Sequence, residues 1–324
     1  MTDPHALNAG LNRRAAFASI SVATLLLGLK GWAVWSTGST AMLGSLADTA
    51  LDLVASLATL GAVWYAAQPA DQNHRFGHGK AEALGAMFQV VLISISAIGL
   101  AWRAIGQFGG GEKVAEADSG VVVSVIAIAA TLALVAYQGH VLRQTRSLAI
   151  STDNVHYKSD LYLNLAVIAA LLLDHYAGLA GADAVFALAI AAWLGWGAWS
   201  ASQEAIEQLM DQEWPLEKRE RFLTVVAQHP ELRGLHDLRT RTSGHRDFVQ
   251  FHVWVDGHMT VAEAHRVMDE IEAKLLAEFP GIEILIHPDP EGHVDEEELG
   301  ARDLLEPGPE GESPALLVQG SPRG

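Results

Sequence analysis

Two carboxylates lie four residues apart inside an apolar stretch that is long enough to cross a lipid bilayer. They are Asp48 and Asp52, in the segment from Ser45 to Ser56. A spacing of i and i+4 places both side chains on one face of a helix, where they could share a divalent cation. A carboxylate at bilayer depth costs about 2.5 kcal/mol or more, which favours a functional role. The alternative is a structural pair that is neutralised by protonation or by hydrogen bonds between helices.

A histidine and an aspartate repeat the same spacing later in the chain, at His156 and Asp160. Two helices that each present two ligands can close a four-ligand shell, the number that Zn²⁺ prefers. Three carboxylates and one imidazole suit Zn²⁺, Cd²⁺, Fe²⁺ or Mn²⁺ and suit Cu⁺ poorly. The sequence therefore predicts one shared metal site made of Asp48, Asp52, His156 and Asp160. A lone histidine would more often form a hydrogen bond between helices.

The imidazole adds proton chemistry to this predicted site. Its reference pKa lies near neutral pH, at about 6.5. A proton and a metal ion therefore compete for the same nitrogen of His156, and binding of one releases the other. Such a site could serve a metal/proton antiporter.

Two further groups of metal-ligand side chains lie outside the apolar runs. Asp71, His74 and His78 fall in a polar loop and could form a three-ligand site, or could be ordinary surface residues. The last third of the chain holds His236, His252, His265 and His287. His236 and His252 are expected on neighbouring strands and His287 with Asp289 at the end of a third, where they could converge on one or two Zn²⁺ ions with Asp289 as a bridge, or could be ordinary surface residues of an acidic domain. The remaining histidines of that third are expected at the surface: His229, His245, His258 and His293.

Composition limits the chemistry that is available. The 324 residues include no cysteine, so disulfides and thiolate metal sites are excluded and a transition metal must use His, Asp or Glu. The formal charge is −17, with 15 acidic and 10 basic residues in 1–211 against 23 and 11 in 212–324. This acidity argues against nucleic-acid binding and against tight adhesion to anionic lipid.

Six apolar runs must position these residues, and each is close to or above the roughly 20 residues that cross the hydrocarbon layer. They cover about 14–36, 40–66, 82–108, 119–142, 148–175 and 182–208. Basic residues gather on one side of the predicted bundle, at Arg13, Arg14, Arg75, Lys80, Arg143 and Arg146, whereas the opposite loops contain only Lys113. By the positive-inside rule both termini are cytoplasmic. No cleavable signal peptide is expected.

A small α+β domain is predicted over 212–290. A helix from Pro215 is followed by strands over 235–242 and 248–255. Thr260 and Glu263 form a capping box that begins a second helix, and a strand over 282–287 completes the order α-β-β-α-β with the helices on one face. The domains are thus 1–12 (a polar N-terminal segment, disordered or interfacial), 13–211 (membrane), 212–290 (soluble) and 291–324 (a disordered acidic tail).

The order and spacing of several short motifs resemble the cation diffusion facilitator family, most closely its bacterial ferrous-iron efflux members. The similarity runs from about Arg13 to Pro290. It is carried by Trp35 to Ser39, Ser45 to Ser56, Gln68 to Asp71, Asn73-His74, Phe76 to Glu82, His156-Tyr157, Ser159-Asp160 and His236 to Arg241. Gln72 departs from the pattern, where a second acid beside Asp71 is expected.

The resemblance implies a homodimeric antiporter of the bacterial inner membrane that exports Zn²⁺, with Cd²⁺ and Fe²⁺ as further candidates, in exchange for protons by alternating access. It implies six membrane helices and a cytoplasmic ferredoxin-like domain. The resemblance places the transport site on Asp48, Asp52, His156 and Asp160, and a loop site on Asp71, His74 and His78. It also implies a binuclear cytoplasmic site made of His236, His252, His265, His287 and Asp289.

The resemblance also implies an ion pair between Lys80 and Asp211 at the dimer junction. No organic cofactor and no nucleic-acid partner are expected. A membrane metal sensor without transport is the main alternative. A membrane metalloenzyme is disfavoured, because the sequence has no His-Glu-x-x-His motif and no separate general base near the aspartate pair.

Overall fold

The structure is a computed structural model that describes residues 4–37, 40–108, 120–177, 182–244, 246–293, 305–306 and 315–316. The chain divides into two compact units, Met1–Leu209 and Met210–Gly324. Each unit is described separately below.

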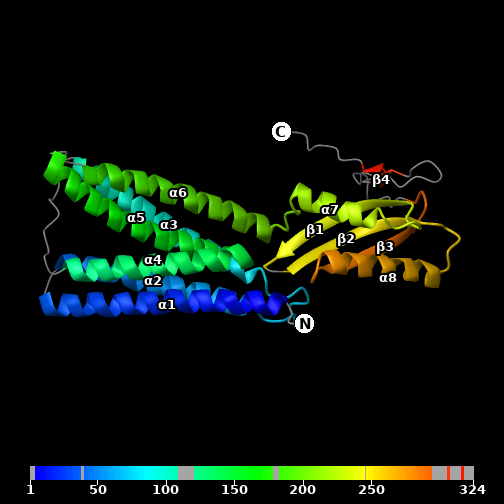
Figure 1. Ribbon diagram of the computed structural model, residues 1–324, viewed down its shortest axis with the longest axis horizontal. Helices are drawn as coiled ribbons and strands as arrows, with labels where there is room; N and C mark the ends of the chain where they lie inside the picture. Colours follow the sequence, from blue (N-terminus) through cyan, green and yellow to red (C-terminus); the bar gives the residue numbers. More distant parts are fainter. Residues whose placement is uncertain are drawn as a thin grey trace. The chain divides into compact units, whose positions relative to one another are not determined.

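The first unit contains six long helices that run along one another (Figure 1). Their bounds are α1 Pro4–Thr37, α2 Thr40–Ala66, α3 Ala81–Phe108, α4 Gly120–Thr145, α5 Leu148–Ala177 and α6 Ala182–Leu209. The predicted apolar runs agree with these helices to within a few residues, except at the start of α1. Close packing is seen between α1 and α2, α3 and α6, α5 and α6, and α1 and α4.

Five of these helices contain described segments that are long and apolar enough to cross a membrane, in α1, α2, α3, α4 and α6. Helix α5 is not among them, because its described side chains lie mainly in its first half, where Asp153, Lys158 and Asp160 gather. Its apolar second half lies largely outside the described side chains. Five spans are found, and six remains a prediction.

The N-terminal segment differs from expectation. Residues 4–12 are helical and continue directly into the apolar part of α1, so disorder is wrong for them, whereas an interfacial position stays a prediction. Asn12 is buried, and its side-chain amide donates a hydrogen bond to Glu82 at 3.4 Å. This end of the polar run is therefore held against α3 through Asn12.

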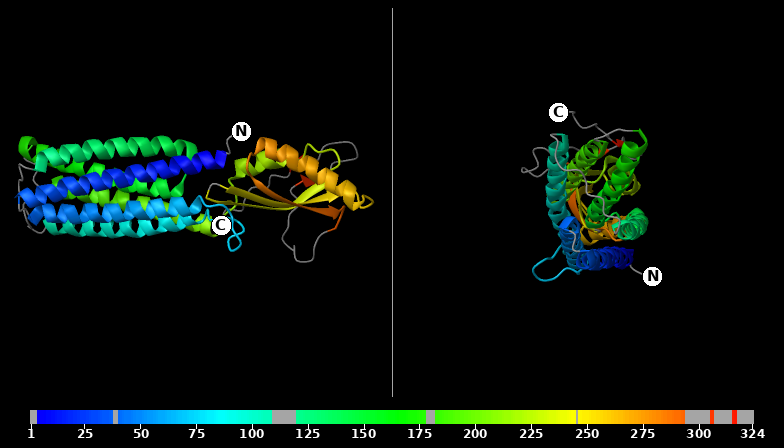
Figure 2. Two further views of the ribbon diagram at one scale, coloured as in Figure 1. Left: turned by 90° about the horizontal axis from the view of Figure 1, so that it is seen from below. Right: turned by 90° about the vertical axis from the view of Figure 1, so that its left-hand side faces the viewer.

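The second unit has the predicted order α-β-β-α-β, with α7 Leu216–Val226, β1 Gly234–Ser243, β2 Arg246–Val255, α8 Val261–Glu278 and β3 Glu283–Pro290. Strand β2 pairs antiparallel with β1 and parallel with β3. The capping box at the start of α8 is present as predicted, because Thr260 and Glu263 exchange hydrogen bonds. Helices α7 and α8 cover one face of the sheet (Figure 2).

Side-chain alternation divides the two faces of this sheet. Val249, Phe251, Val253 and Val255 of β2 are buried in the core with α7 and α8. Neighbouring residues of a strand point to opposite faces, so His252 points away from the helices. His229, expected at the surface, is instead buried, and its Nε2 lies 3.2 Å from an oxygen of Glu270. His258 and His293 are exposed, as expected, and His245 lies outside the described residues.

Part of the expected acidic tail is structured. The sheet order is β3-β2-β1-β4-β5, in which β4 (Leu305–Glu306) pairs with β1 and β5 (Ala315–Leu316) pairs with β4. Disorder is therefore wrong for these four residues. They include Leu305 and Leu316, two of the few apolar residues of the tail. The rest of the tail after residue 293 lies outside the described part of the chain.

Candidate metal-binding sites

The membrane site requires that α2 and α5 be neighbours, and in the structure these helices are in contact. His156 Nε2 lies 2.9 Å from Asp52 Oδ1 and 4.0 Å from Asp160 Oδ2. One ligand atom from each of the three residues lies within 4.8 Å of the others. His156 is buried, whereas the side chains of Asp52 and Asp160 are 19% and 33% exposed. The bundle therefore holds an imidazole between two carboxylates that remain partly accessible.

Asp48 lies outside this three-residue group. It is one helical turn before Asp52 on α2 and its side chain is exposed. Its carboxylate is still near enough to Asp160 for the two charges to repel. The i, i+4 spacing thus places Asp48 beside the group, and the side-chain rotamer decides whether it can reach a shared ion.

Tyr157, the residue that follows His156, holds α5 against two other helices. Its side chain is 2% exposed, and its hydroxyl lies 2.8 Å from Ser56 Oγ on α2. The same hydroxyl donates to the backbone carbonyl of Ser19 on α1 at 3.4 Å. One residue therefore ties α5 to α1 and α2, which restricts the rotation of α5 that would move His156 away from Asp52.

A buried aspartate that we did not assign from sequence lies one turn before His156. Asp153 is 0% exposed, and its carboxylate accepts hydrogen bonds from Ser19 Oγ at 2.6 Å, Gln138 Nε2 at 2.7 Å and Gln89 Nε2 at 2.9 Å. These donors lie on α1, α4 and α3. Gln89 also donates to Thr59 on α2. The signal that could have identified Asp153 was available, because it is the second acid, with Asp160, in the same polar half of α5.

The loop between α2 and α3 brings Asp71, His74 and His78 together, with one ligand atom of each within 4.8 Å of the others. Asp71 Oδ1 lies 3.2 Å from His74 Nδ1, and Asp71 Oδ2 lies 3.4 Å from His78 Nε2. Gly77 turns the loop with a φ of 81°. His78 is buried edge-on against Tyr65, with ring centroids 4.6 Å apart, whereas Asp71 and His74 are exposed.

The backbone of this loop already favours a charged carboxylate. The His74 N–H donates to Asp71 Oδ1 at 2.6 Å, and this bond lowers the pKa of Asp71 below its usual 3.8. Asp71 is therefore ionised at neutral pH and available as a ligand.

In the second unit, the sheet face opposite the helices gathers His236, His252 and Asp289. His236 and His252 are paired across β1 and β2, and His252 is paired with His287 on β3. Asp289 Oδ2 lies 3.0 Å from His252 Nδ1 and 3.4 Å from His236 Nε2. Asp289 Oδ1 lies 3.3 Å from His287 Nε2. Asp289 thus touches three histidines with two oxygens, the arrangement of a bridging carboxylate.

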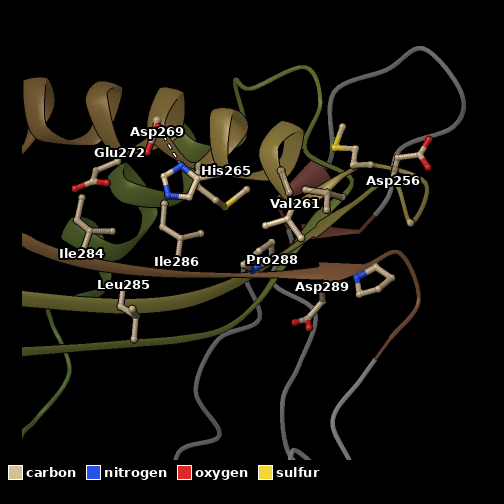
Figure 3. Close-up of a pocket in the computed structure, with 16 residues that line it drawn as sticks. Asp256, Val261, His265, Asp269, Glu272, Ile284, Leu285, Ile286, Pro288 and Asp289 are labelled. Atoms are coloured by element: carbon tan, nitrogen blue, oxygen red, sulfur yellow. Dashed lines mark hydrogen bonds and ion pairs between the residues drawn. The ribbon is translucent and has the colours of Figure 1, made fainter.

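The structure does not bring His265 to this cluster. His265 projects from α8 on the helical side of β3, whereas Asp289 points from the other side of that strand (Figure 3). Its side chain is 74% exposed, and its Nδ1 lies 3.1 Å from Asp269 Oδ2. The sequence did not show that His265 and Asp289 lie on opposite sides of strand β3.

Asp237 is a neighbour of this cluster that we did not predict. The register of β1 and β2 shifts between His236 and Arg239, and Asp237 adopts a φ of 46° in that bulge. Its Oδ2 then lies 4.0 Å from His252 Nε2. A regular strand would have pointed Asp237 to the other face, so no period-2 pattern could predict this contact.

The expected pair of Lys80 and Asp211 joins residues of different units and stays a prediction. Within the first unit, Lys80 Nζ donates to the carbonyl of Leu209 at 3.1 Å. Within the second unit, Asp211 Oδ1 lies 3.4 Å from Arg241 Nη1.

The chain is also similar to proteins of known family. The family described as "Cation efflux transmembrane domain" matches residues 16–210, and "Cation efflux protein, cytoplasmic domain" matches residues 214–291. The "Cation-efflux pump FieF" of Cronobacter sakazakii is 43% identical over 277 residues, which are 86% of this chain and 92% of that protein. The protein of that name from Escherichia coli O127:H6 is 41% identical over 292 residues, 90% of this chain and 96% of that protein.

A solved structure titled "Metal-bound C-terminal domain of CzcD transporter from Thermotoga maritima" is 28% identical, covers 25% of this chain and 94% of that chain, and has a TM-score of 0.24. The two family matches together cover nearly all of residues 16–291. The chain therefore belongs to the cation diffusion facilitator family, whose members are multi-pass cation efflux transporters and not enzymes.

Proposed function

We propose that this chain exports Zn²⁺ from the cytoplasm of a bacterial cell across the inner membrane in exchange for protons, with Cd²⁺ and Fe²⁺ as further substrates. The observation that carries the proposal is the grouping of Asp52, His156 and Asp160, which come from two helices that a cation efflux transporter would place in the membrane. Nothing in such a transporter needs an organic cofactor, because the ion itself is the substrate.

The donor set suits a tetrahedral divalent ion. Bonds of about 2.0–2.1 Å imply ligand atoms about 3.3 Å apart. The distances of 2.9 and 4.0 Å from His156 Nε2 to Asp52 and Asp160 lie on either side of that value. Asp48 would supply the fourth ligand after a change of rotamer, since it lies one turn from Asp52. Two or three carboxylates with one imidazole favour zinc over softer ions.

Charge links the metal to protons. With all three aspartates ionised, the empty site has an excess of negative charge that a bilayer disfavours. Binding of a divalent ion, or of protons, reduces this excess. The loaded and protonated sites should therefore change their exposure more readily than the empty site, and His156 can hold either a proton or the metal. Outward metal flow and inward proton flow are coupled in this way.

The other two clusters would bind metal outside the membrane pathway. We assign Asp71, His74 and His78 to a loop site, and His236, His252, His287 and Asp289 to a binuclear cytoplasmic site, with His265 joining only after it moves. The latter would stabilise a homodimer through the second unit, in which Lys80 and Asp211 pair at the junction. Both termini would be cytoplasmic, and the domain bounds would be 13–211 and 212–290.

Zinc flux into proteoliposomes with an internal pH dye tests the proposal. Asp52→Ala should reduce flux to background and abolish the coupled pH change. Glu204→Ala is the matched control, because Glu204 is an exposed acid in a membrane segment of α6 outside the group. Retained flux in Asp52→Ala would refute the site. Zinc binding by the unaltered protein without any flux would instead favour a metal sensor.

A further inference from the structure

A lysine lies within the membrane part of the first unit, beside the proposed transport site. Lys30 belongs to the α1 segment Asn8–Ser36, which is long and apolar enough to span a membrane. Its Nζ donates to Thr49 Oγ1 at 2.6 Å and to the backbone carbonyl of Ser45 at 3.3 Å. Like an acid, an ammonium in this position has a cost that calls for a function.

The contacts of Lys30 place its charge next to the metal ligands. Thr49 is buried and lies between Asp48 and Asp52 on α2, and Ser45 is one turn before it. The ammonium is also near enough to Asp160 on α5 for the two charges to attract. Its hydrogen bonds nevertheless go to neutral oxygens, and no described ion pair within 4.0 Å includes it. Lys30 therefore acts on the carboxylates through space and leaves their oxygens available to an ion.

Counting charges shows what this ammonium does. Three ionised aspartates and a neutral imidazole have a formal charge of −3, which Lys30 reduces to −2. One divalent cation then makes the set of three proposed ligand aspartates and Lys30 neutral. Without Lys30 the same loaded site would retain one negative charge in a medium where uncompensated charge is costly.

We propose that Lys30 is a built-in counter-cation that matches the transport site to one divalent ion and weakens its hold on that ion enough to allow release. This inference rests on the proposed function of Asp48, Asp52, His156 and Asp160. Lys30 does not bind the metal. It sets affinity and turnover by adding a fixed positive charge near the place where the metal charge arrives.

Zinc flux in proteoliposomes tests this in the full-length protein. Lys30→Met keeps the length of the side chain but removes its charge. We expect the KM for zinc to fall about tenfold or more, which corresponds to about 1.4 kcal/mol per tenfold of affinity. Vmax should fall as well, because a more tightly held ion leaves more slowly. Lys30→Arg keeps the charge and should restore both values to near those of the unaltered protein.

Two further variants complete the design. Arg103→Gln removes a positive charge from an exposed position of α3 and should leave KM and Vmax unchanged. Thr49→Val keeps the ammonium but removes its closest hydrogen-bond acceptor, and should shift KM in the same direction as Lys30→Met by a smaller factor. If Lys30→Met does not assemble, Thr49→Val decides, and an unchanged KM in that variant counts against the proposal.

The outcomes separate this inference from the proposed function. If Asp52→Ala abolishes flux while Lys30→Met keeps the KM and Vmax of the unaltered protein, the counter-cation role is overturned and the transport site stands. If Lys30→Arg behaves like Lys30→Met, shape and not charge is responsible, and the proposal is again overturned. If Asp52→Ala retains flux, the proposed function fails, and the Lys30 proposal fails with it.

Discussion

Replacing Asp153 by alanine should destabilise the helical unit, because this carboxylate is the common acceptor for three helices. Ser19 on α1, Gln89 on α3 and Gln138 on α4 all donate to it, and none of its surface is exposed. Its position one turn before His156 links this packing to the proposed transport site. The variant removes the acceptor and leaves the donors in place.

The expected loss of unfolding free energy depends on which hydrogen-bond partners each donor keeps in the variant. The Ser19 hydroxyl can turn to the Ala15 carbonyl, 3.2 Å away. Each glutamine amide uses one N–H for another partner, Thr59 for Gln89 and Ser19 for Gln138, so one N–H on each loses its acceptor. A buried donor without a partner costs about 1–3 kcal/mol. Hydrogen bonds between membrane helices average only about 0.6 kcal/mol in double-mutant cycles. The small membrane value favours the lower part of the first range, about 1–2 kcal/mol per donor, so two such donors predict a loss of about 2–4 kcal/mol.

Reversible unfolding of the full-length protein in mixed micelles, followed by tryptophan fluorescence, measures this loss. Thr152→Ala is the matched control on the same helix: Thr152 is equally buried, but its hydroxyl donates only to the Leu148 carbonyl of its own helix at 2.9 Å. We expect the control to lose less than about 1 kcal/mol. If Asp153→Ala were no less stable than Thr152→Ala, the cluster would not hold the helices together and the reasoning would be wrong.

Two other predictions use different parts of the chain. Gly85→Ala should destabilise the α2–α3 contact by about 1–3 kcal/mol, because the added methyl group would overlap the Ala62 side chain. Gly99→Ala is the control on the same helix, because its methyl group would meet nothing within 4 Å. It should be neutral or slightly stabilising in the same unfolding assay. Joint replacement of His252 and Asp289 by alanine should remove at least one bound zinc ion per chain in calorimetric titration, and an unchanged stoichiometry would contradict the cytoplasmic site.

The main elements could be predicted because their signals are local. Apolar runs define the six helices of the first unit, and alternation with turn residues defines the three main strands of the second. The spacing of His156 and Asp160, matched with that of Asp48 and Asp52, predicted all three residues of the membrane group. Each of these features depends on residues a few positions apart, which is the range over which helix and strand geometry acts.

Other features could not be predicted because they depend on tertiary contacts. Asp52 and His156 are 104 residues apart, and only packing brings α2 against α5. The exposed rotamer of Asp48 and the bulge that turns Asp237 toward His252 are likewise set by neighbours and not by spacing. The family resemblance implies that His265 joins the other histidines, although α8 holds it on the opposite side of β3.

Strand β3 lies at the edge of the described sheet, and two prolines at its end reduce the N–H donors that the edge offers to a further strand. The N–H of Glu291 donates to the Val255 carbonyl, so odd-numbered residues at this end direct their N–H groups toward β2 and even-numbered residues direct theirs outward. Pro288 and Pro290 occupy the outward positions and have no N–H to offer. An incoming strand would find carbonyl acceptors but no N–H donors at these two positions, which weakens strand pairing there and helps protect an acidic, histidine-rich edge from aggregation. A second copy of the chain that meets this end of the sheet would therefore depend more on side chains or shared ions than on backbone pairing.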